Sequence, residues 1–338
     1  MKPARLQILR GGLQTTVQAT PRLEYRHLGV APGGAADCVS FHQANLLAGN
    51  AEHLAVLEMT LLGDEIAWPD GAVIAVTGAD MRPELLLPDA SAFALPQGRP
   101  VVLPCGSVTR FGAAVSGCRS IVAVAGGIDV PVVLGSRSTL IRSCLGGYSG
   151  RALQAGDELQ FRLPAAICGL SRYFAPDWYV RPETLPRTSP QPLRCLSGAA
   201  WSGLSQGDAG TFLSQPFRVR TESDRMGARL EGPRLQLHRA GEQTSEPTTP
   251  GTVQLLPDGS PLLLLADAAP TGGYPQIAHV ITADLPVAAQ LSPGDSIEFQ
   301  MVQLHEAELE IRRQQQGQRR MSSMIRLMHK ACSAAAGQ

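Results

Sequence analysis

Short apolar segments bounded by Gly, Pro or Asp recur along the whole chain. The most distinct of them cover residues 72–77, 101–104, 120–125, 260–266 and 296–302. They have the length and the β-branched content that are typical of buried strands. The pattern therefore predicts a mainly β protein with a few helices.

Helical patterns are fewer. The clearest covers residues 37–47, directly after a Gly-Gly turn, with Asp37 as the expected N-cap and Gly49 as the expected C-cap. A second helix is predicted over residues 284–290, and a third helical pattern covers the tail from residue 306 onward. A Gly-x-Ser-x-Gly match at residues 203–207 has no helical pattern after it, and this indicates a chance match in a Gly-rich chain.

The chain is predicted to have two β-rich halves, residues 1–165 and 190–303. Residues 154–161 and 292–299 support this division, because each run places a Gly-Asp turn before a strand that ends in Phe. Residues 166–189 are rich in proline, which suits a linker or a surface excursion. Residues 304–338 form a basic tail, for which we expect a partly disordered extension rather than a helix that binds a partner or a membrane surface.

Charge excludes several classes of function. The chain has 338 residues with 29 Lys+Arg and 29 Asp+Glu, so a general nucleic-acid binder is not expected. Only Lys2 and Lys330 are lysines, which removes a P-loop, Schiff-base or biotinyl lysine from the folded body.

Seven cysteines without a Cys-x-x-Cys pair predict neither a metal site nor a disulfide framework. With no apolar run of spanning length, we expect a cytoplasmic protein without membrane contact.

Gly-rich turns and arginine clusters are the candidate binding features. Turns at residues 32–37, 145–150 and 271–275 can expose backbone N–H groups to an anion without any lysine. Residues 223–230 place Asp224 beside Arg225, which suits either a carboxylate ligand or an internal ion pair, and the two interpretations are equally supported. Arg137 lies in a similar hydroxyl-rich cluster at residues 135–139.

Taken together, the ordered motifs resemble the biotin-dependent carboxyltransferase family, whose members include the C-type subunit of 5-oxoprolinase and allophanate hydrolase subunit 2 type proteins. The motifs that carry the resemblance occupy about residues 6–302, and they are Leu13-Gln14-Thr15-Thr16-Val17-Gln18, Gly33-Gly34-Ala35-Ala36-Asp37, Ala123-Val124-Ala125-Gly126-Gly127-Ile128, Gly135-Ser136-Arg137-Ser138-Thr139, Ser223-Asp224-Arg225-Met226-Gly227 and Thr271-Gly272-Gly273-Tyr274-Pro275.

The resemblance implies a cyclophilin-like β-barrel architecture and a function in complex with other polypeptides. It implies a subunit of an ATP-dependent 5-oxoprolinase, which converts 5-oxo-L-proline to L-glutamate with a B-type partner and an A-type subunit that uses ATP and Mg. The chain itself is expected to bind no cofactor, and its small-molecule ligand would be a lactam or a carboxylate. The alternatives are the carboxyltransferase half of a biotin-dependent urea carboxylase-like system and a regulatory binding protein without activity.

The resemblance also implies the site residues. Asp224 and Arg225 are expected to be catalytic, and the substrate-binding residues are expected to be Gln18, Arg22, Gly33, Gly34, Asp37, Arg137, Thr271, Gly272, Gly273 and Tyr274. The sequence departs from the family pattern at Ala19-Thr20-Pro21-Arg22, where Asp-x-Gly-Arg is usual. It departs again at Pro270, where Thr is usual, and at Gln276, where a basic residue is usual.

Overall fold

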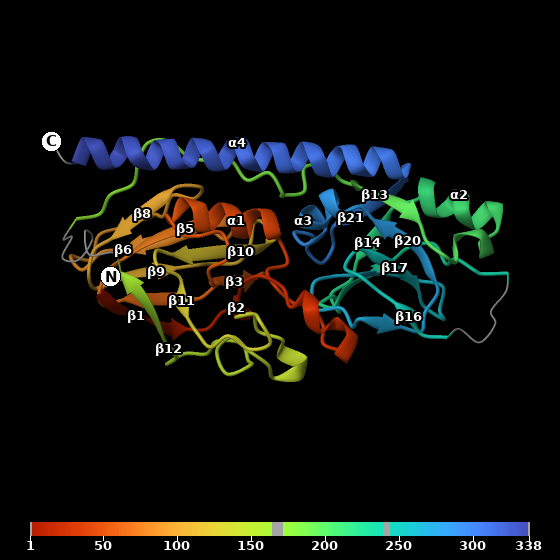
Figure 1. Ribbon diagram of the computed structural model, residues 1–338, viewed down its shortest axis with the longest axis horizontal. Coiled ribbons are helices and arrows are strands. Elements are labelled where there is room, and N and C mark those ends of the chain that lie inside the picture. The colour runs from red at the N-terminus through yellow and green to blue at the C-terminus, as the bar shows by residue number, and fades with distance from the viewer. Residues whose placement is uncertain (1, 164–171, 239–243, 337–338) are drawn as a thin grey trace. The chain divides into compact units, whose positions relative to one another are not determined.

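The computed structural model describes residues 2–163, 172–238 and 244–336 (Figure 1). The chain forms two compact units, each built from more than one segment. The first unit comprises Met1–Pro21, Asp37–Leu185 and Gly317–Gln338, and the second comprises Arg22–Ala36 and Pro186–Gln316. Residues 22–36, which the sequence pattern placed in the N-terminal half, thus belong to the second unit.

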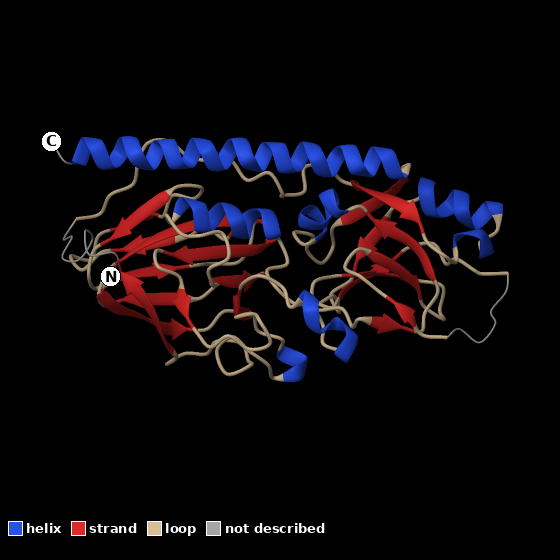
Figure 2. Ribbon diagram, in the orientation of Figure 1, coloured by secondary structure: helices blue, strands red, loops and turns tan. Residues whose placement is uncertain are grey.

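The first unit contains two sheets (Figure 2). A seven-stranded sheet has the order β11-β12-β1-β4-β9-β6-β7, and a five-stranded sheet has the order β2-β3-β10-β5-β8. Their strands are β1 (Lys2–Arg10), β2 (Gln14–Gln18), β3 (Val56–Thr60), β4 (Glu65–Trp68), β5 (Ala72–Asp80), β6 (Glu84–Leu86), β7 (Ala92–Ala94), β8 (Pro100–Leu103), β9 (Ser107–Arg110), β10 (Ser116–Val124), β11 (Ile128–Asp129) and β12 (Glu158–Leu163).

The core of this unit follows from the alternation of side chains along the strands. In the five-stranded sheet, Val17, Leu57 and Val122 point into a cluster that also holds residues of the seven-stranded sheet, including Trp68 and Phe161. The rings of Trp68 and Phe161 meet edge to face with their centroids 6.3 Å apart. The alternate residues of β2, β3, β5 and β10 therefore form the opposite face of the five-stranded sheet.

Helix α1 (Cys38–Leu47) packs on the five-stranded sheet. Its N-cap is Asp37, whose carboxylate accepts hydrogen bonds from the backbone N–H of Ser40 at 3.0 Å and from its hydroxyl at 2.7 Å. The C-cap is Ala48 and not the predicted Gly49, which comes next with φ +77°, a conformation that glycine adopts without strain. The Thr77 hydroxyl of β5 donates to the Ser40 carbonyl at 2.8 Å and fixes the helix to the sheet. The predicted helix and its predicted N-cap are both confirmed.

The second unit is a closed seven-stranded barrel of order β13-β20-β17-β18-β15-β14-β21, with a separate ladder of β16 and β19. The prediction of a mainly β protein with a barrel architecture is confirmed. The elements of this unit are η1 (Leu23–Leu28), β13 (Gln191–Ser197), α2 (Gln206–Ser214), β14 (Phe217–Val219), β15 (Gly227–Glu231), β16 (Glu246–Pro247), β17 (Thr252–Leu255), β18 (Pro261–Leu264), β19 (Thr271–Gly272), β20 (Gln276–Val280), α3 (Leu285–Ala288) and β21 (Ser296–Met301).

Aromatic side chains fill the barrel end that α2 covers. Phe212 of α2 stacks on Phe299 of β21 with ring centroids 4.4 Å apart and an interplanar angle of 11°. Phe217 packs against both rings at 5.9 Å. Phe212 is the one buried residue of α2, so a single side chain supplies most of the apolar surface by which this helix is held.

The two similar runs recognised in the sequence adopt the same turn. The Asp157 carboxylate accepts from the backbone N–H of Gln154 at 2.8 Å, and the Asp295 carboxylate accepts from that of Ser292 at 2.7 Å. The glycine before each acid lies at positive φ, +93° in the first turn and +95° in the second. A carboxylate that bonds to nearby backbone and a glycine at positive φ are what such a turn requires, and each turn leads into a strand, β12 or β21.

The C-terminal tail is a 33-residue helix, α4 (Leu304–Ala336), as the helical pattern from residue 306 indicates, and it is not the partly disordered extension that we expected. Ile325 is 2% exposed, and His329 adds a contact to the Leu46 carbonyl at 3.2 Å. The run can form one long helix because it contains no proline and a single glycine, Gly317. Within the described chain, no helix has the length and apolar character needed to cross a membrane.

The described part of the Pro-rich segment, residues 172–185, is packed on the first unit. Phe174 forms a bridge with Val102, and the Val180 N–H donates to the Gly98 carbonyl at 2.7 Å. The Thr184 hydroxyl donates to the Asp37 carboxylate at 2.6 Å. We call residues 172–185 the strap; residues 166–171 of the predicted linker lie outside the described residues.

Candidate functional site

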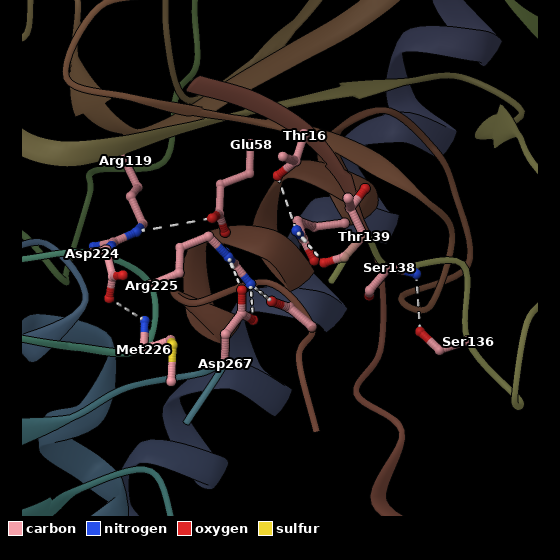
Figure 3. A network of polar contacts seen from close by, with 12 residues as sticks. Thr16, Glu58, Arg119, Ser136, Ser138, Thr139, Asp224, Arg225, Met226 and Asp267 are labelled. Atoms are coloured by element: carbon pink, nitrogen blue, oxygen red, sulfur yellow. Dashed lines mark hydrogen bonds and ion pairs between the residues drawn. The ribbon is translucent and has the colours of Figure 1, made fainter. Parts of the chain in front are cut away.

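In the second unit, Arg225 is the centre of a buried polar cluster. Its side chain is 4% exposed and makes a two-pronged ion pair with Asp267, with Nε and Nη2 each 2.9 Å from a carboxylate oxygen (Figure 3). The same Nη2 donates to the Gly34 carbonyl at 2.6 Å. Of the two interpretations of Asp224 and Arg225, an internal ion pair is therefore present, but its acid is Asp267.

Asp224 has a local role in the same loop. Its carboxylate accepts from the backbone N–H groups of Met226 at 2.7 Å and Gly227 at 3.2 Å, as an Asx turn does. A Cβ at Gly227 would lie 2.9 Å from Leu262 Cδ1 and 3.1 Å from the Leu263 carbonyl oxygen, so glycine lets β15 lie close to β18 at this point. The turn presents the Arg225 carbonyl to the Asp267 N–H at 2.9 Å and so aligns the ion pair.

The segment 22–36 is attached to the barrel at several points. The Gly33 N–H donates to the Ala266 carbonyl at 3.1 Å, next to the Gly34 contact with Arg225. Arg26, on η1, donates to the Thr248 carbonyl. The structure thus brings Gly33, Gly34 and Arg225 together in the second unit.

Arg22 belongs to the same cluster because the charge of Asp267 acts on its guanidinium. Its side chain is buried, and burial lowers the pKa of its guanidinium, while the Asp267 carboxylate opposes this shift. The Asp267 carboxylate thus acts on both arginines, through an ion pair with Arg225 and through its charge on Arg22.

The predicted loop at residues 271–274 is linked to η1 through Thr248. Thr271 and Gly272 form β19, and the Thr248 N–H donates to the Pro270 carbonyl at 2.9 Å. A Cβ at Gly272 would lie 2.4 Å from the side-chain nitrogen of Gln254, so a larger residue there would displace the Gln254 amide. Gly273 and Tyr274, the other two predicted residues of this loop, are exposed.

Gln276, one of the positions at which the sequence departs from the pattern it resembles, has a structural role. It is 4% exposed, and its amide donates to the Pro247 carbonyl at 2.9 Å. A neutral amide satisfies this buried position without the desolvation cost of a charge. The departure from the family pattern is thus accommodated by a hydrogen bond to β16.

In the first unit, buried polar side chains form a row on the face of the five-stranded sheet that α1 covers. The register pairs Thr16 with Glu58 across β2 and β3, and Arg119 of β10 lies diagonally beside Glu58. Arg119 Nε is 3.9 Å from a Glu58 carboxylate oxygen, and both side chains are at most 4% exposed (Figure 3). A β-bulge between Ser116 and Ser120 shifts the register beside Arg119, as often occurs near functional sites.

Gln18 ends this row with an unpaired acceptor. Its amide nitrogen donates to the Thr16 hydroxyl at 2.9 Å and to the Thr139 carbonyl at 3.2 Å. Its Oε1 is buried, and no described residue donates to it. Because an unsatisfied buried carbonyl costs about 1–3 kcal/mol, an atom of this kind indicates a place for a ligand donor or a water molecule.

The hydroxyl-rich loop at residues 136–139 holds β2 in place. The Thr139 N–H and hydroxyl both donate to the Val17 carbonyl, at 3.0 and 2.9 Å. The Ser138 hydroxyl accepts from the Ala19 N–H at 2.8 Å. The Ser138 N–H in turn donates to the Ser136 hydroxyl at 3.0 Å (Figure 3). Ala19 is therefore compatible with the loop because its backbone, not its side chain, makes the contact.

Three further candidates from the sequence have structural contacts of their own. Asp37 is fully buried, and its carboxylate accepts hydrogen bonds from the Ser40 N–H at the start of α1 and from the Thr184 hydroxyl. Arg137 donates from Nε to the Val130 carbonyl at 3.0 Å and lines a pocket of about 230 Å³. Ser205 of the Gly-x-Ser-x-Gly match is the N-cap of α2, so a helix does follow it, but the hydroxyl is engaged with Asp208.

Sequence reasoning did not identify Arg119 or Asp64. Arg119 lies two residues before the apolar run 121–124 of β10, and an arginine on that strand was the available signal. Asp64 is fully buried, and burial raises the pKa of its carboxyl from 3.8 to about 6, with a smaller opposing effect from the Gly12 N–H whose hydrogen bond it accepts. Nothing local in the sequence distinguishes Asp64 from a surface turn residue.

Burial of Asp64 is expected to make the stability of the first unit depend on pH. Because the pKa of the Asp64 carboxyl in the folded state lies above its usual value, the protonated carboxyl adds its full contribution to the free energy of unfolding below about pH 4. This contribution is lost as the pH rises through about 6. Asp64→Asn keeps an acceptor for Gly12 and removes the buried charge. We expect this variant to exceed the wild type in unfolding free energy by about 1–3 kcal/mol at pH 8 and by much less at pH 4. Urea unfolding at both pH values measures the difference; an equal effect at both would contradict the assignment.

Comparison with known proteins places the chain in a family. A model described as "Carboxyltransferase domain, subdomain A and B" matches residues 28–301, and the chain belongs to this family. It is 33% identical to the C-type subunit of 5-oxoprolinase from Haemophilus influenzae, covering 89% of this chain and 93% of that protein. It is 35% identical to the corresponding 5-oxoprolinase subunit of Escherichia coli, with 92% and 95% covered.

Urea-metabolising enzymes contain similar segments. The chain is 33% identical to the urea amidolyase of Saccharomyces cerevisiae, covering 88% of this chain but 17% of that protein. Among solved structures, the urea amidolyase of K. lactis matches with a TM-score of 0.82 and 29% identity, covering 96% of this chain and 20% of that one. The predicted family is confirmed, and its named relatives are subunits or segments of enzymes.

Proposed function

We propose that this chain is the C-type subunit of an ATP-dependent 5-oxoprolinase and acts together with an A-type subunit, which uses ATP and Mg, and a B-type partner. The observation that carries the proposal is the likeness to two 5-oxoprolinase subunits of this type, which extends over 93–95% of their length. The urea amidolyase relative is matched over only 17% of its length. The chain itself holds no cofactor in this proposal.

The first unit offers a buried polar group with chemistry that such a substrate needs. 5-Oxoproline carries a lactam N–H, a lactam carbonyl and a carboxylate. Gln18 Oε1 is an acceptor without a donor among the described residues, and a lactam N–H supplies one. In the second unit, Arg225 is a positioning residue in this proposal, because it holds the turn at Gly33 and Gly34 in place.

The direct test is glutamate release. The chain, co-purified with its A-type and B-type partners, is expected to release L-glutamate from 5-oxo-L-proline only when ATP is present. Omission of this chain is the control and is expected to abolish the release. A stable complex that produces no glutamate would contradict the proposal.

The Gln18 acceptor gives a sharper test. Gln18→Met preserves volume but removes Oε1, and we expect it to lower kcat/KM for 5-oxoproline at least about tenfold, the value of one hydrogen bond to a buried group. Gln14→Met is the matched control, because Gln14 lies on the same face of β2 at its other end. The kinetics of both variants are compared in the assembled complex. Equal losses, or none at Gln18, would remove Gln18 from the site.

A second candidate is the carboxyltransferase half of a biotin-dependent urea carboxylase-like system. The observation that favours it is the structural likeness to urea amidolyase over 96% of this chain. It predicts transfer of a carboxyl group from carboxybiotin to urea when a biotinylated partner is supplied. Assay of the same complex with carboxybiotin and urea separates the two candidates.

A further inference from the structure

A pocket of about 360 Å³ lies in the first unit, between β5, α1 and the strap. Its walls are formed by residues of β5, α1, the turn before β8, β10 and the strap, and these are Val76, Thr77, Gly78, Asp80, Gln43, Gln97, Gly98, Ser116, Tyr179, Val180, Pro182 and Leu185. The polar row of Gln18, Glu58 and Arg119 is not part of its lining. The pocket is therefore distinct from the groups that the proposed function uses.

The strap forms a fixed roof over this pocket. It is anchored on one side by the Val180 N–H to the Gly98 carbonyl at 2.7 Å, and on the other by Thr184 to Asp37 at 2.6 Å. A Cβ at Gly98 would lie 2.2 Å from the Val180 carbonyl oxygen, so the close approach depends on glycine. Arg99 secures the strap further by donating to a strap carbonyl, that of residue 176, at 2.6 Å. The cavity is thus preformed, which lowers the entropic cost of binding.

One carboxylate dominates the charge of the pocket. Asp80 Oδ1 accepts from the Arg82 N–H at 2.8 Å and from Gln97 Nε2 at 2.9 Å, and no described residue donates to Oδ2. Ser116 is the register partner of Asp80 and brings a hydroxyl to the same rim. None of the lining residues is basic, so Asp80 is the charge that a ligand meets.

The rest of the lining suits an alkyl chain with a cationic end. Val180, Pro182 and Leu185 supply apolar surface. The Tyr179 ring also lines the pocket and already attracts a cation, since the Arg99 guanidinium carbon lies 5.3 Å from the ring centroid. The two glutamines of the lining offer further carbonyl acceptors to N–H donors.

We propose that this pocket is a binding site for a small organic cation of the alkylamine class, with the ammonium at Asp80 and the alkyl chain along the strap. An anion would meet the Asp80 carboxylate without a compensating arginine in the lining. The site would therefore reject both 5-oxoproline and glutamate carboxylates and is independent of the proposed reaction.

Three probes of similar shape test the charge preference on the full chain. Butylammonium, pentanamide and pentanoate are titrated at constant ionic strength, and binding is followed by isothermal calorimetry and by NMR shifts. We expect butylammonium to saturate with a Kd in the range of about 1–10 mM, pentanamide to bind several-fold more weakly and pentanoate not to saturate. Pentanoate binding as tight as that of butylammonium, or no saturation by butylammonium up to about 100 mM, would overturn the proposal.

Variants locate the site. Asp80→Asn retains an Oδ1 acceptor for Arg82 and Gln97 but removes the charge, and we expect it to weaken butylammonium binding at least about tenfold while pentanamide binding is unchanged. Ser116→Leu fills the rim and is expected to weaken both probes. Asp129→Asn is the matched control, since Asp129 is an exposed carboxylate of the same unit outside this pocket. Unchanged butylammonium affinity in an Asp80→Asn protein with a wild-type melting temperature would refute the assignment.

Discussion

Replacing Arg225 by methionine is expected to lower the free energy of unfolding of the second unit by about 3–5 kcal/mol. The substitution leaves the Asp267 carboxylate, whose side chain is 12% exposed, without the guanidinium that binds both of its oxygens. It also removes the donor to the Gly34 carbonyl, so residues 22–36 lose one of their attachments to the barrel. Denaturant unfolding of the variant, followed by a probe in the second unit, measures the loss.

Two further variants show what Arg225 contributes. Arg229→Met is the matched control, because Arg229 lies on the neighbouring strand β15 but is exposed, and we expect a change below about 0.5 kcal/mol. The double variant Arg225→Met, Asp267→Leu removes both charges and is expected to recover much of the stability. Turnover should remain low in the double variant, because the Gly34 contact is still missing. Wild-type turnover in Arg225→Met would instead remove Arg225 from the site.

Phe212→Ala is expected to destabilise the barrel by about 3–5 kcal/mol, the usual cost of emptying a fully buried aromatic position. The ring is fully buried and stacks on Phe299 at 4.4 Å, so its loss leaves a cavity bounded by Phe217 and Phe299. Because Phe212 is the one buried residue of α2, the helix should also detach earlier than the barrel melts. Thermal unfolding monitored by circular dichroism measures both effects.

The neighbouring leucine is the control for this substitution. Leu213→Ala changes the next position of the same helix, where the side chain is 37% exposed, and we expect a loss of less than about 1 kcal/mol. Similar losses at Phe212 and Leu213 would mean that helix propensity, and not the aromatic stack, holds α2.

Local patterns predicted much of the fold. The strands over residues 72–77, 101–104, 120–125, 260–266 and 296–302 correspond to β5, β8, β10, β18 and β21, because each apolar run is bounded by residues that end strands. Asp37 was identified as an N-cap because its chemistry and position are both local. The helical pattern of the tail was visible from residue 306, but its order was not, because α4 is held by contacts distant in sequence, such as that of His329 with the Leu46 carbonyl.

The candidate site was less predictable because its contacts are distant in sequence. Arg225 meets Asp267 across 42 residues and the Gly34 carbonyl across 191. Glu58 and Arg119 become neighbours only through the register of β3 and β10. The resemblance supplied Gln18 and Arg225 as motif positions, but no pattern in one sequence shows that Gln18 Oε1 lacks a donor or that Arg225 holds a turn.

The Asp37 carboxylate couples two segments of the first unit, so that they are expected to open together. It accepts from Ser40 at the start of α1 and from Thr184 at the end of the strap. Release of the strap therefore also exposes the first turn of α1, and fraying of that turn loosens the strap. Amide hydrogens in both segments would exchange with solvent through a common opening event, and any ligand held under the strap would slow the exchange of both.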